Sequence, residues 1–202
     1  MDAVAPAGRI ADTSIDALFR EARTHIAWTD QPVAPALLRE LYDIARMAPT
    51  SGNCNPMRVV FVMSPDGKER LRPALRPGNL DKTMAAPVTA IVGTDMMFHE
   101  HLPRLAPHAA DMLKRYQEEP ELAARAAFRN ASLQGAYLIL AARALGLDCG
   151  PMSGFDHGTV DRAFFGGTNV KSNFLINLGY GDRTRLRQRA ERFSFDEACG
   201  IV

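Results

Sequence analysis

Apolar residues along the chain fall into two patterns, helical spacing in some segments and short continuous runs in others. Apolar positions three and four residues apart predict helices over Ile15–Arg23, Pro35–Ala48, Ala109–Gln117 and Ala123–Leu145. Short apolar runs predict buried strands at Val59–Met63, Val88–Val92 and Phe174–Leu178, with a further short strand through Met152. Because the two kinds of element do not alternate regularly, we expect an α+β fold.

Proline, glycine and aspartate mark the ends of several predicted elements. Pro49 ends the second helix, and Gly146 caps the longest one. A helix is expected to follow Asp156 as its N-cap and to run to Phe165. The sequence Pro65–Gly67 predicts a turn after the first strand, followed by a short helix around Lys68–Leu75 and a polar segment, Pro77–Lys82.

The segment Phe98–Glu119 has the least regular pattern, because Pro103 and Pro107 interrupt it. It contains the sequence's one cluster of possible metal ligands, His99, Glu100, His101 and His108. Their spacing suits neither a single helix face nor a cysteine-containing zinc site, so we expect no bound metal. The simpler interpretation is a mobile, partly exposed lid, in which a histidine is available to protonate a substrate.

The composition predicts one soluble domain that spans residues 1–202. With 202 residues, 47% of them hydrophobic, the chain can bury one sizeable core, and no apolar run reaches the roughly 18 residues of a membrane span. The three cysteines, Cys54, Cys149 and Cys199, are too far apart for a metal or redox pair, which favours a cytoplasmic protein with reduced thiols. A net charge of +1 gives no general attraction to nucleic acid or to membranes.

Several nucleotide-binding and hydrolase motifs are absent from the sequence. There is no GxGxxG after a predicted strand and no GxxxxGK[ST], so neither a Rossmann site nor a P-loop is indicated. A GxSxG nucleophile elbow is missing too. We therefore expect neither a permanently bound NAD(P) nor a serine hydrolase.

Two loops instead carry residues suited to contact a ligand. APTSGNCNPMR, residues 48–58, places Thr50, Ser51 and Asn53 between a helix and a strand, where binding loops are commonly held. GLDCGPMSGFD, residues 146–156, includes Ser153 and Gly154, and glycine lets backbone amides approach a ligand closely. Ordinary turns remain the alternative interpretation of both segments.

Cations and amides suited to a phosphate or to an electron-rich ring lie outside these loops. Five arginines fall between residues 183 and 192, of which Arg189 and Arg192 are candidates for phosphate contact together with Arg23. Asn79 and Lys82 form a second pair, in which Lys82 would stabilise negative charge on a reduced ring. The alternatives are a solvated basic edge for the arginines and a surface position for the lysine.

In the order in which they occur, these segments resemble the motifs of FMN-dependent nitroreductases. ARTHIAW, residues 22–28, resembles the RRSxRxF motif, residues 48–58 resemble PSSxNxQP, and GNLDK resembles NxxK. GPMSGFD resembles the segment that approaches flavin N5, and FSFDEA resembles the terminal LEE segment. The chain departs from these motifs at Ile26, Asn55 and Met57, where the family has a basic residue, glutamine and tryptophan.

Longer matches, among them APVTAIV, ALGLDxGPMSGFD, KSNxLINxGYGD and SFxEACG, resemble the RutE-type malonic semialdehyde reductases within that family. The resemblance implies a homodimer with FMN at the subunit interface. It also implies a central mixed, mainly antiparallel sheet flanked by helices, and a C-terminal extension that reaches the partner subunit. The implied reaction reduces malonic semialdehyde to 3-hydroxypropionate in pyrimidine (uracil) degradation, by ping-pong hydride transfer from NADPH or NADH through flavin N5.

The resemblance further implies which residues contact the cofactor. They are Arg23, Thr24, His25, Thr50, Ser51, Asn53, Asn79, Lys82, Ser153, Gly154, Arg189 and Arg192. No catalytic residue is assigned. Candidates for the substrate carboxylate or the proton donor rest on chemical type alone, and they are Arg58, Arg104, Arg129 and His108.

Three other functions remain open on the sequence. A broad nitro or quinone reductase would have the same fold, and a flavin-dependent enzyme that uses oxygen would share the cofactor. A non-enzymatic module that binds anions or nucleic acid would use the arginine-rich C-terminal segment. That segment lacks the interleaved aromatic residues that single-stranded nucleic acid would require.

Overall fold

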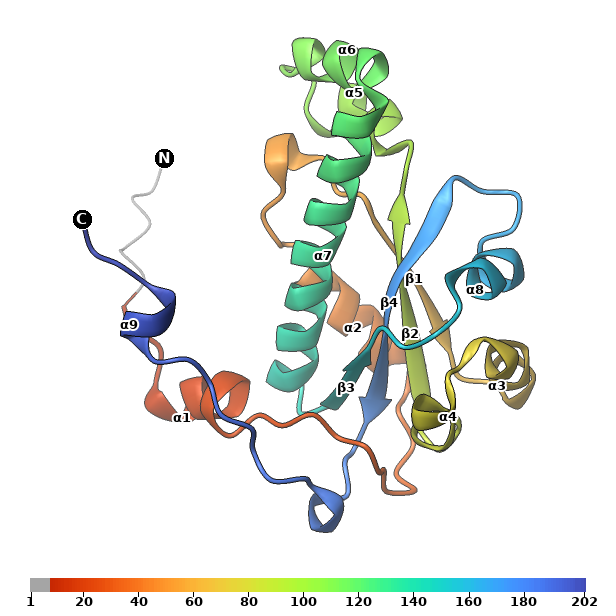
Figure 1. Cartoon of the computed structure of the whole chain (residues 1–202), viewed down its shortest axis with the longest axis vertical. Coiled ribbons are helices and arrows are strands. Elements are labelled where there is room, and N and C mark those ends of the chain that lie inside the picture. The colour runs from red at the N-terminus through yellow and green to blue at the C-terminus, as the bar shows by residue number, and fades with distance from the viewer. Residues whose placement is uncertain (1–7) are drawn as a thin grey trace.

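The computed structural model describes residues 8–202, which form a four-stranded antiparallel sheet with helices on both faces (Figure 1). β2 and β4 lie at the centre of the sheet, and β1 and β3 form its two edges, in the order β1-β2-β4-β3. The strands are β1 (Met57–Val62), β2 (Val88–Asp95), β3 (Asp148–Met152) and β4 (Val170–Gly179).

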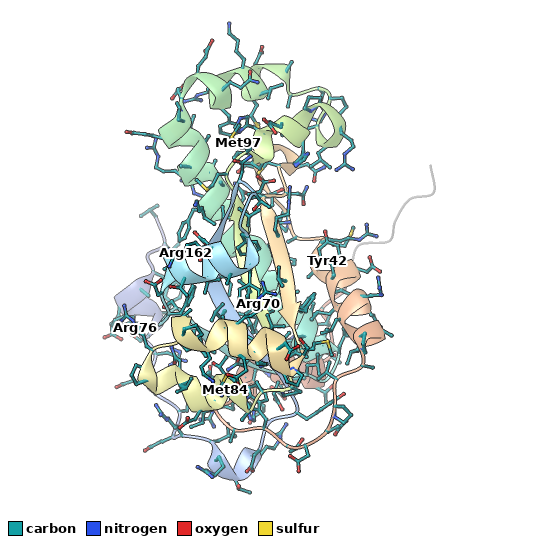
Figure 2. The ribbon with its side chains drawn as sticks, turned by 90° about the vertical axis from the view of Figure 1, so that its right-hand side faces the viewer. Tyr42, Arg70, Arg76, Met84, Met97 and Arg162 are labelled. Carbon is teal, nitrogen blue, oxygen red and sulfur yellow. The ribbon has the colours of Figure 1, made fainter. Side chains whose placement is uncertain are left out.

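Helices cover both faces of the sheet. One face carries α2 and α7, and the other carries α3, α4 and α8, which lie in front of the sheet in Figure 2. Their bounds are α2 (Pro35–Ala45), α3 (Pro65–Leu71), α4 (Pro77–Met84), α7 (Pro120–Ala144) and α8 (His157–Phe164). The longest, α7, crosses the sheet and contacts all four strands. None of the helices formed by residues 8–202 combines the length and the apolar character needed to cross a membrane.

Alternating side chains of β2 enter two different hydrophobic cores. Val88, Ala90 and Val92 pack against α2 and α7 on one face. Ile91 packs on the other face, in the core that includes Leu71 of α3. Because helices cover both faces, β2 is buried along its whole length, which explains its continuous apolar run.

The sheet agrees with the predicted nitroreductase-like α+β architecture and refines it in one respect. All pairs among the four strands are antiparallel, so within residues 8–202 the expected mixed character is confined to a single parallel bridge between Thr24 and Cys149. Two predicted helix ends are confirmed as well. Gly146 has φ 79° after α7, and the Asp156 side chain accepts a hydrogen bond from the Thr159 amide at the start of α8.

Three predicted local structures differ in detail from the structure. Pro65–Gly67 is the first turn of α3 and not a closing turn, because the Ser64 side chain caps the Gly67 amide and Pro65 needs no hydrogen-bond partner there. The polar segment Pro77–Lys82 is helical and belongs to α4. The first predicted helix is only α1 (Asp12–Ile15) with a π-helical turn that ends at Arg20.

The segment after β2 is a packed helical lobe and not an open lid. It contains a 3-10 turn (Phe98–His101), α5 (Leu102–Leu105) and α6 (Ala110–Glu118). The lobe has a hydrophobic core of its own, in which the rings of Phe98 and Tyr116 meet edge to face at 5.1 Å. His99 is buried in it, at 6% exposure, so the predicted exposed lid is wrong for this part of the segment.

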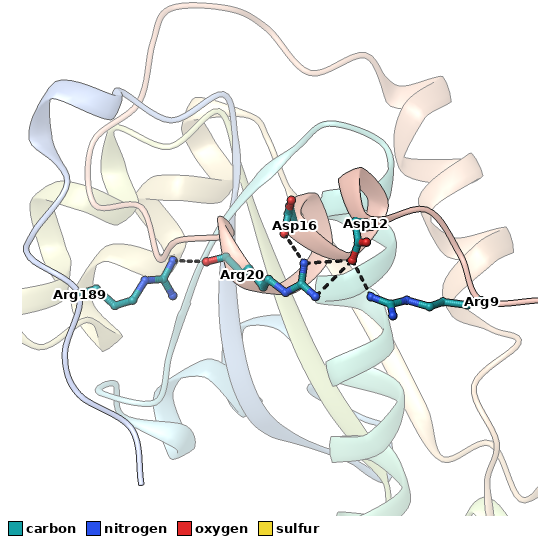
Figure 3. Close-up of polar contacts among 5 residues, drawn as sticks. All are labelled: Arg9, Asp12, Asp16, Arg20 and Arg189. Carbon is teal, nitrogen blue, oxygen red and sulfur yellow. Dashed lines mark hydrogen bonds and ion pairs between the residues drawn. The ribbon is translucent and has the colours of Figure 1, made fainter. Parts of the chain in front are cut away.

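The C-terminal segment runs beside the N-terminal elements after a 3-10 turn (Arg183–Arg185) and includes α9 (Phe195–Ala198) (Figure 1). Arg189 donates to the Arg20 carbonyl oxygen at 2.7 Å, and the Arg20 guanidinium itself pairs with Asp12 and Asp16 (Figure 3). The side chain of Phe193 on this segment is 81% exposed, so residues 8–202 of the same chain leave most of it uncovered.

The packing of α7 on the sheet predicts the cost of a core deletion. Leu138 is fully buried between α7 and the sheet, so Leu138→Ala should lower the free energy of unfolding by about 2–5 kcal/mol, measured by urea denaturation. Arg125→Ala on the same helix removes an exposed side chain and should change the free energy of unfolding by less than about 0.5 kcal/mol. Equal effects of the two substitutions would contradict this packing.

Candidate functional site

The segment around Arg23 extends the β3 edge of the sheet. Thr24 bridges Cys149 in parallel, and the His25 amide donates to the Cys149 carbonyl oxygen at 2.9 Å. This register places the Arg23 side chain beside the C-terminal segment, where it donates to the Arg187 carbonyl oxygen. Two parts of the chain that were predicted to supply phosphate contacts therefore lie next to each other.

Lys82 belongs to the same region. The Trp28 indole, a few residues after Arg23, donates to the Lys82 carbonyl oxygen at 3.0 Å. Burial, and after it the positive charge of Arg187, lowers the pKa of the Lys82 ammonium. Arg187 thus lies near both Lys82 and Arg23, and the three residues make a local positive field suited to an anion.

Asn79 and Gly154, two further predicted residues, are in direct contact. The Asn79 side-chain amide donates to the Gly154 carbonyl oxygen at 2.7 Å, which joins α4 to the loop after β3. A Cβ atom at position 154 would lie 2.5 Å from that amide nitrogen, so glycine is needed for the approach. Ser153, the neighbouring residue, is exposed.

The His25 ring is turned into the protein, in contrast to its predicted role in cofactor contact. Its exposed fraction is 2%, and its Nε2 lies 3.2 Å from an Asp148 carboxylate oxygen. A Cβ atom at Gly181 would collide with this ring, which explains the glycine there. Burial lowers the pKa of His25. Within one chain, the ring packs the N-terminal segment onto β3, and the whole residue is buried.

The two predicted tail arginines differ in their surroundings. Arg189 donates to the carbonyl oxygens of Arg20 and Ala22, directly before Arg23. Among residues 8–202, Arg192 donates only to the carbonyl oxygens of Ala190 and Glu191, its near neighbours in sequence. Within one chain, Arg189 is thus close to the predicted phosphate contacts and Arg192 is not brought to them.

The other predicted residues lie in the loop before β1, which has an unusual backbone. Gly52, Asn53 and Asn55 all have positive φ, at 55°, 52° and 41°. Asparagine adopts this region more readily than most residues, so the sequence suits the fold locally. The Asn53 side-chain amide donates to the Leu105 carbonyl oxygen at 2.8 Å and ties the loop to the helical lobe.

Two buried residues of α7 hold this loop, and the sequence analysis missed both. The Asn130 side-chain oxygen accepts the Ser51 amide at 2.9 Å. The Gln134 side-chain oxygen accepts the Met57 amide at 2.9 Å, and its amide donates to Asn55 at 3.1 Å. Two amide side chains four residues apart on an otherwise apolar helix face were the available signal, because buried polar groups need partners.

A cavity of about 1050 Å³ opens beside the loop, and Thr50, Asn53 and Asn55 form part of its wall. The described residues that line it include no carboxylate but do include His101 and three arginines, Arg46, Arg58 and Arg104. Arg58 pairs with Asp95 at 2.5 Å and Arg46 with Asp43 at 3.1 Å, whereas Arg104 makes no ion pair within residues 8–202. The cavity therefore favours an anionic group, with Arg104 as its least engaged arginine.

The predicted residues thus form two groups that do not meet within one chain. Arg23, Asn79, Lys82 and Gly154 lie around β3 and the end of β2 near Thr89, while the loop around Thr50 leads into β1, where Met57 pairs with Thr94. Three strand spacings separate the two edges, about 14 Å, and the span along β2 adds about 17 Å. Because the two spans lie at right angles, the two groups are about 22 Å apart, which is farther than one flavin ring could bridge by hydrogen bonds.

This fold and these loops match a known family over most of the chain. The profile described as "Nitroreductase family" matches residues 20–180. The chain belongs to the nitroreductase family. This confirms the family that the sequence motifs indicated, while the RutE-type subfamily stays a prediction.

Relatives of this nitroreductase-family chain support the same assignment. A protein of Burkholderia lata, provisionally named an NADH dehydrogenase/NAD(P)H nitroreductase, is 60% identical over 192 residues, which cover 95% of this chain and 98% of that protein. A provisionally assigned nitroreductase of Bacillus subtilis has a crystal structure with a TM-score of 0.86 at 22% identity, covering 95% of this chain and 100% of that one. One from Exiguobacterium sibiricum, solved in complex with FMN, has a TM-score of 0.82 at 17% identity, covering 97% and 100%. The two crystal structures show that the fold is shared.

No group of three or more histidine, cysteine, aspartate or glutamate side chains within residues 8–202 is arranged to hold a metal ion. His101 lies 3.4 Å from Asp95, which Arg58 also engages. The histidine cluster of the lobe is thus divided between its buried core and its surface, with His99 buried and His101 at the cavity.

Behind the first group, this nitroreductase-family chain contains a buried polar network centred on Lys68. The Lys68 ammonium donates to the Thr83 carbonyl oxygen and to the Thr89 hydroxyl, both at 2.7 Å. The Thr89 hydroxyl donates to Asn177 at 2.8 Å. Burial lowers the pKa of Lys68 to about 8, because its charge has only neutral partners.

The lowered pKa of Lys68 predicts how stability depends on pH. The folded protein releases this proton near pH 8 and the unfolded chain near 10.5, so the folding free energy should become more favourable as the pH rises between these values, by about 3 kcal/mol at most. Urea denaturation at pH 7 and at pH 10 should show this gain in stability for the wild type, and the gain should be absent in Lys68→Met. A gain of the same size in the variant would show that other groups cause it.

Proposed function

We propose that this protein is an FMN-dependent oxidoreductase that uses NADPH or NADH, and that two copies of the chain form each FMN site. The observation that carries the proposal is the division of the predicted contacts into two groups on opposite edges of one sheet. A symmetric pair of chains can bring the first group of one copy to the second group of the other, because an isologous dimer repeats each contact twice.

The first group has the donors that a flavin mononucleotide requires. Arg23 and Arg187 supply cations for a phosphate, and Arg183 is close enough to add to the effect of burial in lowering the pKa of His25. Asn79, Lys82 and the backbone of Ser153 and Gly154 offer donors for the ring. These assignments rest on the donor set and on the family motifs that the sequence shares.

The second group would approach the same ring from the partner chain. Thr50, Ser51 and Asn53 are held rigidly by Asn130 and by the lobe, so a ligand would meet a preformed surface. The outer face of α7 exposes Phe128, Leu133 and Tyr137, a set of apolar side chains that a second copy would cover.

When bound, FMN supplies hydride transfer between NAD(P)H and a second substrate. The residues of the chain have the simpler tasks of binding, orientation and charge stabilisation. Lys82 would supply a positive charge to the negative charge that develops on the ring when it is reduced. The absence of a Rossmann motif agrees with a pyridine nucleotide that binds transiently and leaves. A single-domain enzyme of this kind would act in the cytoplasm.

We further propose malonic semialdehyde as the substrate, reduced to 3-hydroxypropionate in pyrimidine degradation. The RutE-type motifs support this substrate, and the cationic cavity beside the loop suits its carboxylate. Of the four candidate side chains, Arg58 is engaged by Asp95, and Arg129 lines a groove on the outer face of α7. His108 is exposed on the lobe. Arg104 is therefore the preferred carboxylate ligand.

A broad nitro or quinone reductase is the second candidate, since it would use the same fold and cofactor. The name of the Burkholderia lata relative favours it. The two functions predict different effects of removing Arg104, because a nitro or quinone substrate needs no carboxylate for Arg104 to bind.

A two-chain site predicts complementation between damaged chains. Lys82→Met and Thr50→Val should each weaken FMN binding in homodimers. Coexpressed under two affinity tags, they should form a hybrid dimer with one intact site, because both substitutions then fall on the other site. Flavin absorbance per hybrid dimer measures this. If the hybrid holds no more flavin than its parents, each site is built within one chain.

The preferred carboxylate ligand gives a prediction on substrate choice. Arg104→Met should lower kcat/KM for malonic semialdehyde about tenfold or more, the usual effect of losing a hydrogen bond to a charged group. Propanal, which lacks the carboxylate, serves as the matched substrate and should lose no more than about twofold. Parallel losses for both aldehydes would remove Arg104 from this role, and turnover of nitroaromatics alone would favour the broad reductase.

A further inference from the structure

Lys68 is a buried cation that the proposed reaction does not use directly. Its side chain lies between α3, the end of α4 and β2, with 5% of its surface exposed. Its two hydrogen-bond acceptors, the Thr83 carbonyl oxygen and the Thr89 hydroxyl, are both neutral. No carboxylate within residues 8–202 pairs with it.

A lysine in this position is costly to keep. A buried charge without a counter-ion loses its hydration, and an apolar residue of similar volume is commonly as stable or more stable in its place. Packing alone therefore does not account for Lys68. Its hydrogen bonds instead indicate which part of the molecule it fixes in place.

Both acceptors lead to the C-terminal turn of α4. Thr83, whose carbonyl oxygen Lys68 binds, directly follows Lys82. Thr89 donates to Asn177, and the Asn177 side-chain amide contacts the Lys82 carbonyl oxygen and the Thr83 hydroxyl, both at 3.2 Å. The last turn of α4 is thus fixed in place by a chain of hydrogen bonds that begins at Lys68.

That turn carries the groups assigned to the cofactor. Lys82 is on it, and Asn79 is one helical turn earlier, where it reaches Gly154. Helix α4 is short, and Thr83 is its one buried residue, so it has little apolar packing to fix its position. Its orientation must come mainly from polar contacts at its end.

We propose that Lys68 is a positioning residue for the cofactor site: its buried ammonium fixes the C-terminal turn of α4, and thereby Lys82 and Asn79, without touching the ligand. This inference rests on the proposed FMN site. Packing and solvation do not explain why a charged side chain is kept at this buried position, whereas positioning Lys82 and Asn79 does.

The single tryptophan of the chain reports on this turn. Trp28 is the one tryptophan among 202 residues, and its indole donates to the Lys82 carbonyl oxygen. Its emission therefore monitors the end of α4 in protein without cofactor. Added FMN should quench the same emission, which gives the dissociation constant from one titration.

The experiment compares Lys68→Met with Lys114→Met, which removes an exposed lysine from α6. In Lys68→Met we expect Trp28 emission at longer wavelength before FMN is added, because the indole loses a fixed partner and gains water. We expect FMN to bind about tenfold more weakly, the usual scale for losing hydrogen bonds from a charged donor. Lys114→Met should match the wild type in both measurements.

A second variant, Thr89→Val, removes one acceptor of Lys68 with little change in volume and should shift both readouts in the same direction. Unchanged emission and FMN affinity in a cooperatively folded Lys68→Met protein would overturn the proposal. So would loss of cooperative unfolding in both variants, since Lys68 would then serve the fold alone. A wild-type protein that takes up no FMN would instead refute the proposed function, while the Trp28 emission would still test the hold on α4.

Discussion

Hydrogen bonding of one sheet fixes the distance between the two groups of residues on which the proposed site depends. Adjacent strands lie about 4.8 Å apart, so residues attached to β1 and β3 stay separated by the width of β2 and β4. Neither group can approach the other without breaking the sheet. In the proposed dimer, the polar loop before β1 of one chain therefore meets the basic segment along β3 of the other.

Buried polar side chains make each group rigid. Asn130 and Gln134 on α7 satisfy the backbone of a loop with three positive φ angles, and Lys68 and Asn177 do the same for the end of α4. These side chains lie behind the residues that would touch a ligand. A preformed surface loses less conformational entropy on binding than a flexible one, which is a physical reason for burying polar groups at such cost.

Much of the fold could be predicted from the sequence, because β2 and α7 have patterns that reflect their burial. Helix α4 could not, since it is polar and buries only Thr83, so no apolar periodicity marks it. The core of the lobe was missed because its apolar residues are spread over several short helices. For the site, residue chemistry indicated which side chains could contact a phosphate or a ring. The local sequence contains no signal for which of these residues lie together in the fold, or for the burial of the His25 ring.

The central claim is that residues of two chains together hold one FMN at each of two equivalent positions. Native mass spectrometry of the purified protein, with gradual dissociation of the complex, tests it most directly. The account predicts a dimer that carries two FMN molecules and releases them as it separates into chains. A monomer that keeps FMN bound, or a dimer that takes up none when FMN is supplied, would contradict it.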